Sequence, residues 1–494
     1  MRVAPYSRRL SRRFRRAATA LGTTAAVCVT MGLLPSALTG QLSAGEIRDG
    51  RVLVLSGATV VDGTGSEPLP DANVVVEGDR ISCVGSAEEC PPPSGARELE
   101  LDGHWITPGL VDAHVHFSQS GWVDGRPDAR DLRHEHPYPE TVLELRQNPE
   151  RFFRAYLCSG VTAVFDVGGY PWTWGLRGHA EPGQPVPRIA AAGPLLSTRD
   201  HWVNLPAELQ FVHIPDEEGV RAGIEYLVSR DTDAVKVWYL VQPGTAEEAT
   251  YRPLLELAGA LAQEAGVPLI VHATALEAAK QAIRSGAHLL VHSVTDQIVD
   301  DEFLEMARDA GTMYNPTLTV YEGYHDIQAG FFREGRYPLD CVDPGTLQRA
   351  RATEEWRDTV DPEEVALSAR ELEQRNRLLA ENLRRVHQAE IPIAAGTDAG
   401  NPLTLHGPSI HRELSMMRQA GLTPMEVLVS ATLNGARAMG RAEDFGSIEA
   451  GKLADLLVVG SDPTVDLNAF EDLSFLLLGG EIHRPEALLP DPPR

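Results

Sequence analysis

Short apolar segments alternate with longer amphipathic ones from Leu110 to about residue 420, and this alternation constrains the fold more than any other feature. Apolar runs of four to eight residues are typical of buried strands, and strands that alternate with helices form parallel sheets. Eight such strands predict an α/β fold, a TIM-type (β/α)₈ barrel over residues 107–442. The expected strands are 110–117, 161–168, 188–196, 234–239, 268–273, 288–293, 313–318 and 391–399.

Helical patterns follow most of these strands, whereas the Gly-, Pro- and Trp-rich link 169–187 is expected to be a loop. The stretch 319–367 is an insertion after the seventh strand. Loops at this position lie at the catalytic face of such barrels, so this insertion is expected to be either a lid or a wall of the substrate site. The alternative is an insertion with a purely structural role. The expected helices are 248–265, 276–285, 300–310, 368–389, 408–420 and one near 424–440.

The two ends of the chain carry a different pattern, in which short alternating apolar runs are broken by turn residues. This pattern is typical of antiparallel strands. It covers residues 45–106 and returns over residues 443–489, so we expect one small β-sandwich domain built from both ends. Residues 490–494 are expected to be a loose tail.

The N-terminal segment is read as an export signal. Residues 1–16 contain seven arginines and no acidic residue, and an apolar run from Ala17 to Leu38 follows. A basic region before such a run is typical of a secretory signal, here with a loose twin-arginine character. We therefore expect residues 1–44 to direct export to the periplasm or medium, with cleavage between Ala37 and Ala44. The alternative is an uncleaved membrane anchor, because the run is close to spanning length.

Charge and cysteine content exclude some partners and sites. The formal net charge of −26 argues against nucleic acid and against anionic membrane surfaces as partners. The five cysteines show no CxxC spacing, which disfavours a thiolate zinc site. Cys83 and Cys90 flank a predicted turn and are read either as a disulfide or as two free thiols. The expected partners are a small-molecule or dipeptide substrate and other copies of the chain in a homo-oligomer.

Two histidines close the first barrel strand. Residues i and i+2 of a strand point the same way, so His114 and His116 can bind one ion together. His134 and His136 have the same spacing but lie in a predicted loop. Only the first pair lies at the carboxyl end of a barrel strand, where active sites of this fold lie.

Three more strands end in residues suited to the same site. His272 and His292 end the fifth and sixth strands, and Asp398 ends the eighth among small residues. One such histidine alone is more often a satisfied core residue, and Asp398 alone could cap a turn. Together with the first pair at the same face, they indicate metal ligands, with Asp398 as a ligand or a base.

Lys236 lies within the fourth strand between apolar neighbours. Burial lowers the pKa of a lysine and leaves a neutral, nucleophilic amine, which can add carbon dioxide and become a carbamate that bridges two metals. The alternative is a salt-bridged or snorkelling lysine. The chain has only two other lysines, Lys280 on a predicted helix face and Lys452 in a predicted loop, and both are expected to be solvated.

Four segments in this order resemble the amidohydrolase superfamily, and the resemblance covers Val52 to about Leu478. The Val-Lys-Val motif at Lys236 and the segment from His406 to Leu414 are similar to the imidazolonepropionase-like branch, which includes Xaa-Pro dipeptidases. The four segments are Ile106–His116, Gly396–Gly400, Ala431–Arg437 and Gly446–Asp455.

This resemblance implies a binuclear hydrolase with two divalent ions, by default Zn²⁺. His114, His116 and Asp398 would hold the buried ion, and His272 and His292 the outer one. Carboxylated Lys236 would bridge them. A shared hydroxide would attack the carbonyl carbon of an amide, and Asp398 would pass its proton to the leaving nitrogen. The implied substrates are dipeptides of the Xaa-Pro kind or N-acyl amino acids.

The chain departs from relatives with dipeptidase activity at two places. Such relatives commonly have a Gly-Gly-His segment after the third strand, where this chain has Ser197-Thr-Arg-Asp-His201-Trp. His201 is still expected to polarise the carbonyl group or to meet a substrate carboxylate. An arginine common in the second strand is replaced by Phe165. Tyr239, at the end of the fourth expected strand, and Tyr321, in the insertion, are further expected substrate contacts.

Two other functions remain open at this point. A cyclic amidohydrolase or deaminase would use a mononuclear site, so metal stoichiometry separates it from the binuclear hydrolase. A non-catalytic binding protein on the same barrel would typically have lost metal ligands, whereas all six candidates are present.

Overall fold

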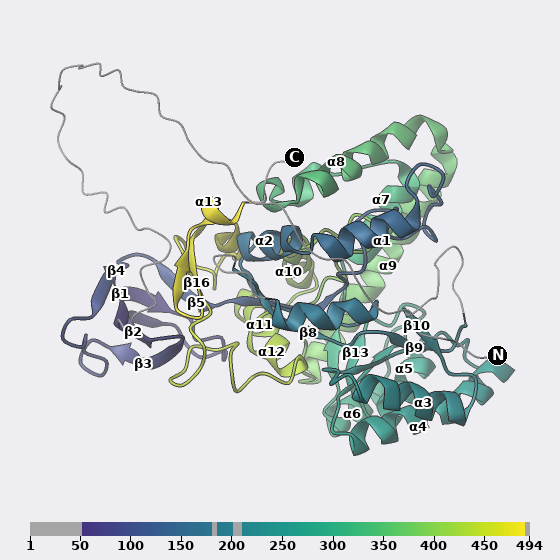
Figure 1. The fold of residues 1–494 in the computed structure, drawn as a ribbon, viewed down its shortest axis with the longest axis horizontal. Coiled ribbons are helices and arrows are strands. Elements are labelled where there is room, and N and C mark those ends of the chain that lie inside the picture. Colours follow the sequence, from purple (N-terminus) through teal and green to yellow (C-terminus); the bar gives the residue numbers. More distant parts are fainter. Residues whose placement is uncertain (1–51, 180–184, 201–209, 490–494) are drawn as a thin grey trace, which may run out of the picture. The chain divides into compact units, whose positions relative to one another are not determined.

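The computed structural model describes residues 52–179, 185–200 and 210–489 (Figure 1). The predicted export signal, the predicted tail and His201 lie outside these residues. No helix in the described part of the chain is long and apolar enough to cross a membrane.

Parallel strands from the middle of the chain form two sheets, as an α/β fold requires. A three-stranded sheet has the order β6-β7-β8, and a six-stranded sheet has the order β10-β9-β11-β12-β13-β14. The strands are β6 (Leu110–Val115), β7 (Val161–Asp166), β8 (Arg188–Ala191), β9 (Leu195–Ser197), β10 (Phe211–His213), β11 (Val235–Trp238), β12 (Leu269–His272), β13 (Ala287–Val291) and β14 (Met313–Asn315).

Two expected strands differ from the prediction. The third one, 188–196, is divided into β8 and β9 at Gly193, whose φ of 68° interrupts an extended chain and whose missing Cβ leaves room for the Trp174 ring. The eighth, 391–399, makes only isolated bridges, through Ile393 to Tyr314 and through Ala399 to Val115. Asp398, near the end of this segment, has a φ of 61°, which departs from extended backbone. The described strands therefore do not close one continuous barrel.

Helices connect and cover these strands (Figure 1). The expected helix near 424–440 is two helices, because the backbone breaks at Thr432, with φ −130° and ψ −91°. The link 169–187 contains a short 3₁₀ helix, Pro171–Gly178. The helices are α1 (Tyr138–Gln147), α2 (Glu150–Cys158), α3 (Glu217–Val228), α4 (Ala246–Glu264), α5 (Leu276–Arg284), α6 (Asp301–Ala310), α7 (Val320–Ala329), α8 (Pro344–Ala352), α9 (Pro362–Gln388), α10 (Ser409–Gln419), α11 (Pro424–Ser430), α12 (Leu433–Ala438) and α13 (Pro485–Leu488).

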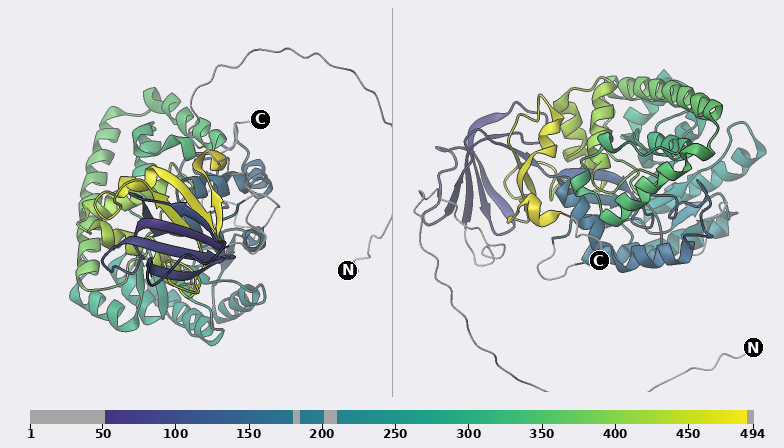
Figure 2. Two further views of the ribbon diagram at one scale, coloured as in Figure 1. Left: turned by 90° about the vertical axis from the view of Figure 1, so that its left-hand side faces the viewer. Right: turned by 90° about the horizontal axis from the view of Figure 1, so that it is seen from above.

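Strands from both ends of the chain lie side by side in one eight-stranded sheet (Figure 2, left). The link between the two ends is the antiparallel pairing of β15 with β5, in which Val458 lies opposite Ile106. The sandwich form of this region and its boundaries stay predictions. The strands are β1 (Val52–Val60), β2 (Leu69–Glu77), β3 (Arg80–Ser86), β4 (Arg97–Glu100), β5 (Trp105–Pro108), β15 (Leu456–Val459), β16 (Leu473–Leu478) and β17 (Glu481–His483).

The insertion after β14 is helical and packs on the loop that follows β6. Trp122 of that loop is buried, stacks on Trp356 with ring centroids 5.5 Å apart and donates a hydrogen bond of 3.0 Å to Thr353 Oγ1. A disulfide between Cys158 of α2 and Cys341 ties the insertion to the barrel. No local pattern predicts this pairing, because 183 positions separate the two cysteines.

Two local expectations are also decided. Cys83 and Cys90 form a disulfide, so the alternative of two free thiols is wrong. Lys280 is not solvated: its side chain is 3% exposed, and its Nζ lies 2.7 Å from Asp300 Oδ2 and 2.6 Å from Glu302 Oε2. The acids lie on and before the neighbouring helix α6, which the pattern of α5 alone could not reveal. Lys452 is also largely covered, with Glu449 at 2.9 Å.

Candidate metal centre

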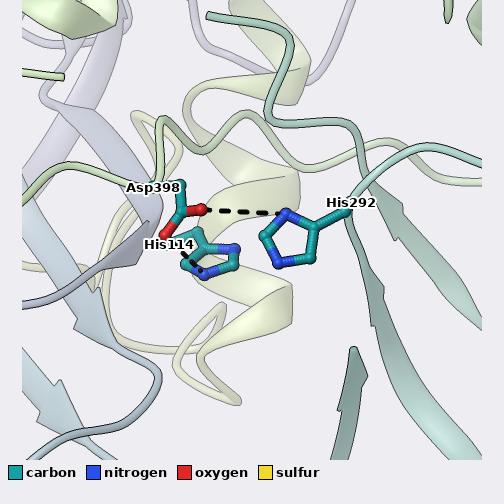
Figure 3. A group of neighbouring side chains, drawn as sticks. All are labelled: His114, His292 and Asp398. Carbon is teal, nitrogen blue, oxygen red and sulfur yellow. Dashed lines mark ion pairs between the residues drawn. The ribbon is translucent and has the colours of Figure 1, made fainter. Parts of the chain in front are cut away.

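Four of the six predicted ligands meet at the carboxylate of Asp398, which is itself one of them. Asp398 Oδ1 lies 3.3 Å from His114 Nε2 and 3.0 Å from His116 Nε2. Its second oxygen lies 3.8 Å from His292 Nδ1. Figure 3 shows the side chains of His114, His292 and Asp398 pointing toward one another, and one ligand atom of each lies within 4.8 Å of those of the other two.

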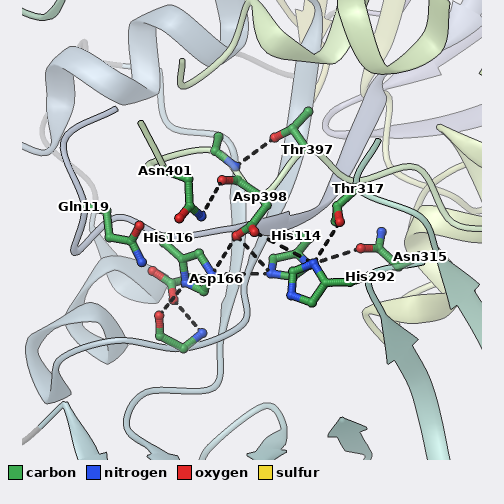
Figure 4. A network of polar contacts seen from close by, with 12 residues as sticks. His114, His116, Gln119, Asp166, His292, Asn315, Thr317, Thr397, Asp398 and Asn401 are labelled. Carbon is green, nitrogen blue, oxygen red and sulfur yellow. Dashed lines mark hydrogen bonds and ion pairs between the residues drawn. The ribbon is translucent and has the colours of Figure 1, made fainter. Parts of the chain in front are cut away.

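Neighbouring groups fix which nitrogen of each imidazole faces this centre (Figure 4). Asn315 donates through Nδ2 to Ala394 O, so its Oδ1, 3.1 Å from His114 Nδ1, must accept the proton of that nitrogen. Likewise His116 Nδ1 donates to Gly168 O at 2.6 Å. Both Nε2 atoms are then left with free lone pairs, as ligation of a metal requires.

The donor set fits a divalent cation. The Nε2 atoms of His114 and His116 lie 3.3 Å apart, and both face Asp398 Oδ1. This oxygen accepts no hydrogen bond from the described residues. Three acceptor atoms this close repel one another unless a positive charge lies among them. A proton does not supply it, because burial holds the pKa of His114 well below its usual range. Nitrogen and carboxylate ligands of this kind suit zinc and similar metals.

His272 and Lys236 extend the cluster along the neighbouring strands. Because β11 and β12 pair in parallel, Lys236 and His272 reach the same cavity, where the His272 ring packs edge-on against His292 at 4.5 Å. Burial, together with the positive charge of Lys236, lowers the pKa of His272 to about 3. His272 is therefore neutral, the form that binds a metal.

Lys236 has the environment that a reactive amine needs. Lys236 is only 2% exposed and forms no ion pair with the described residues. Burial lowers its pKa to about 7, against the opposing charges of Asp398 and Asp166. The neutral amine is thus well populated at neutral pH, which favours addition to carbon dioxide. The carbamate itself stays a prediction.

Three residues at the site have unusual backbone conformations. His292, Thr317 and Asp398 have φ values of 71°, 44° and 61°. Non-glycine residues occupy this region at an energetic cost and do so most often at functional sites. Thr317 Oγ1 lies 2.8 Å from His292 Nδ1 and fixes that ring. Strain here turns the side chains of His292 and Asp398 toward the centre.

A layer of buried acids, none of which the sequence reasoning identified, supports the ligands. Asp112 accepts a 2.6 Å hydrogen bond from Thr397 Oγ1 and so holds the turn of Asp398. Glu413 of α10 accepts from the backbone of Leu318 and Thr319, next to Thr317. Burial raises the pKa of Asp112 to about 7 and that of Glu413 to about 8.

Asp166 completes this layer. It is the last residue of β7, at the same strand end at which His114 lies in β6, so its position at a strand end was a usable signal. It accepts hydrogen bonds from the backbone of Phe117 and Gly168, and Gly168 in turn accepts from His116. Burial raises the pKa of Asp166 to about 6. Asn315 likewise ends β14, so the same signal was available for it, whereas Thr317 lies beyond that strand and comes to His292 only through the packing of the chain there.

The predicted substrate contacts have different outcomes. Tyr321 of α7 lines the cavity beside the metal centre, as does Tyr324. Tyr239 is buried but is not among the described residues that line it, because the alternation of β11 turns Lys236 and Trp238 inward instead. Trp238, next to it in the chain, lines the cavity, and a substrate contact of Tyr239 stays a prediction. His201 lies outside the described residues. His134 of the second His-x-His pair is exposed and pairs with Glu135.

Comparison with known proteins agrees with this architecture. The family described as "Amidohydrolase family" matches residues 105–482. An uncharacterised protein of Mycobacterium tuberculosis strain H37Rv is 24% identical over 423 residues, which cover 84% of this chain and 94% of that protein. An imidazolonepropionase of Pseudomonas fluorescens is 25% identical over 445 residues, with 84% and 92% covered.

A solved structure is also similar. It is described as a Xaa-Pro dipeptidase with methionine bound in the active site, and it aligns with a TM-score of 0.65 and 22% identity over 88% of this chain and 100% of that one. At this identity the likeness shows the fold alone. It supports the TIM-type barrel as the arrangement to which the two parallel sheets belong.

Proposed function

The chain belongs to the amidohydrolase family and is a metal-dependent hydrolase that acts on carbon–nitrogen bonds. From this premise, we propose that it is a binuclear enzyme that cleaves the amide bond of a dipeptide or an N-acyl amino acid. The observation that carries the proposal is the convergence of four imidazoles, one carboxylate and one buried lysine on a single cavity.

The ligands divide between two positions. His114, His116 and Asp398 form the tighter group, with contacts of 3.0–3.3 Å, and would hold the inner ion. His272 and His292, whose rings touch, would hold the outer one. Zinc is the default for this set. A carbamate on Lys236 would supply one oxygen to each position: the neutral amine adds to the carbon of CO₂, a C–N bond forms, and one proton is released to solvent.

When bound, the ions supply Lewis acidity, which polarises the substrate carbonyl and lowers the pKa of water. The residues of the chain do the rest. Asp398 faces the cavity with Oδ1 and is placed to accept a proton and to deliver it to the leaving nitrogen. Asn315 and Gly168 O hold the ligand imidazoles in one tautomer. Tyr321 would contact the substrate, and His201 would polarise its carbonyl group or meet a carboxylate.

Cellular location forms part of the proposal. The basic and apolar segment before Ala44 supports export, and the disulfide between Cys158 and Cys341 supports an oxidising compartment such as the periplasm. The membrane-anchored alternative and the homo-oligomer stay predictions.

The test is turnover by the zinc-loaded enzyme on a library of dipeptides and N-acyl amino acids, together with metal content measured by mass spectrometry. We expect turnover and two ions per chain. His116→Ala should lose the inner ion and activity. His134→Ala is the matched control, because it removes the first histidine of the exposed second pair and should change neither. Two ions without turnover of any amide in the library would contradict the proposed substrate class.

Hydrolysis of a cyclic amide is the second candidate, favoured by the similarity to imidazolonepropionases. It predicts one ion per chain and activity on ring amides but not on dipeptides. A lysine as deeply buried as Lys236 beside the site argues for the binuclear alternative, because a mononuclear centre gives it no role.

A further inference from the structure

Three side chains form a polar wall at one side of the cavity: Arg126, Tyr324 and Asn401. Tyr324 donates a 2.8 Å hydrogen bond to Asn401 Oδ1, and Arg126 Nη1 donates to the same oxygen. Asn401 Nδ2 donates at 3.0 Å to the backbone oxygen of Asp398. Figure 4 shows Asn401 beside Asp398, on the side away from His292. The polar wall is therefore held directly against the residue expected to move the proton.

Arg126 brings a positive charge to this wall. Its side chain is 14% exposed, and two of its nitrogens donate to Asp128 at 2.9 and 2.7 Å. Among the described residues that line the cavity, only Arg126 and Lys236 carry cationic side chains. Removing a guanidinium from water is costly, and the two-point contact with Asp128 fixes its plane.

Donor capacity remains on this guanidinium. A guanidinium has five N–H groups, and short bonds to Asp128 and Asn401 use three of them. Gln119 Oε1 lies 3.5 Å from Nη1, a distance at which a stronger acceptor can displace it. Tyr324 packs its ring 5.8 Å below the guanidinium. A planar anion would meet a pre-arranged donor here.

The side of the cavity near His272 is apolar. Trp238 packs edge-on against His272 at 6.1 Å and stacks on Phe211 with ring centroids 5.1 Å apart. Leu195 lines the same cavity. The metal centre is thus bordered by a cationic wall next to Asp398 and an aromatic wall next to His272. Such a cavity favours a ligand that is anionic at one end and apolar at the other.

We propose that Arg126 determines specificity by binding the free α-carboxylate of the amino acid that leaves, while Phe211 and Trp238 receive an apolar acyl or aminoacyl group. This inference rests on the proposed function. It narrows the substrate class to N-acyl or N-aminoacyl amino acids with a free carboxylate and excludes their neutral, amidated counterparts. The leaving nitrogen of such a substrate would lie on the Asp398 side, where its proton must arrive.

The test is binding, measured by isothermal titration of the zinc-loaded protein with N-acetyl-L-phenylalanine and with N-acetyl-L-phenylalaninamide. These two probes differ only in the terminal group, which is an anionic carboxylate in the first and a neutral carboxamide in the second. We expect the wild type to bind the carboxylate about 10- to 100-fold more tightly, as loss of a charge-assisted contact would cost. Arg126→Met should abolish this preference, and Arg126→Lys, which keeps the charge but not the fork, should reduce it.

Arg133→Met is the matched control. Arg133 lies in the same loop and makes the same kind of contact with an acid two residues away, Asp131, but it is exposed. It should leave the preference unchanged.

Three results would overturn the inference. The first is equal binding of the two probes by the wild type. The second is an undiminished carboxylate preference in Arg126→Met, which would assign that preference to the ions. The third is an equal loss of affinity for both probes in Arg126→Met, which would make the role of Arg126 structural. If Arg126→Met does not fold, Arg126→Lys decides. A carboxylate preference without turnover of any amide would refute the proposed function and leave only the contact between Arg126 and a ligand carboxylate.

Discussion

Lys236→Met is expected to destroy activity and at the same time to stabilise the metal-free protein. The lysine is almost fully buried among metal ligands, where it serves the chemistry and opposes folding. Methionine has a similar length and no charge, so it should fill the same space without the cost of desolvation. It cannot form a carbamate. We therefore expect one ion or none per chain and a fall in kcat/KM of more than about 100-fold. Loss of a residue that only hydrogen-bonds a metal ligand costs up to about 100-fold, so loss of a ligand itself should cost more.

The size and pH dependence of the stabilisation follow from the pKa of Lys236. Burial lowers this pKa from 10.5 to about 7. At about 1.4 kcal/mol per pKa unit, this shift destabilises the folded protein by about 5 kcal/mol below pH 7, where Lys236 is charged in both the folded and the unfolded protein. The penalty shrinks between pH 7 and 10.5 and vanishes above that range. Because such replacements recover only part of the penalty, we expect a gain of about 1–4 kcal/mol at pH 7.

Chemical denaturation of the metal-free, carbon-dioxide-depleted protein at pH 7 and pH 10 measures this gain, and mass spectrometry measures the ions. A gain at pH 7 that is much smaller at pH 10 agrees with the reasoning. Destabilisation by methionine at pH 7 would show that the lysine makes favourable contacts, and the burial argument would be wrong. Retention of both ions and of the rate would refute the bridging role.

Three further predictions test the surroundings of the site. Asn315→Leu should leave the fold intact but weaken zinc binding about 10- to 100-fold, measured by competition with a chelator, because His114 loses the acceptor that sets its tautomer; unchanged affinity would contradict that role. Replacing Cys158 and Cys341 by serine should destabilise the protein by about 2–5 kcal/mol in denaturant titrations, because this disulfide closes a long loop, whereas loss of the short Cys83 disulfide should cost less. Lys280→Met should lower Tm at pH 7, and the difference in Tm should narrow as pH falls below 4. The reason is that the hydrogen bond to Lys280 lowers the pKa of Glu302 in the folded state. The stability that this carboxylate contributes is therefore present above its ordinary pKa and is lost when it is protonated. A Tm difference independent of pH would show that packing, not charge, holds Lys280.

The alternation of apolar strands and helices determined the α/β class, and strand ends located the ligands. His114 and His116 could be chosen over the exposed pair at His134 because the side-chain period of a strand and the polarity of a parallel sheet are local rules. The same rules placed Lys236, His272, His292 and Asp398 at one face. These residues needed no knowledge of distant contacts.

Tertiary structure alone decided what surrounds them. Asn315 orients His114 across a separation of 201 positions, and Arg126 meets Asn401 across 275. Neither pairing follows from periodicity, because the chain path between strands sets which loops meet. The same reason explains the acidic partners of Lys280, which come from the neighbouring helix α6 and the residue before it. The local sequence pattern determines the direction in which a side chain points, and packing between distant segments determines which groups it contacts.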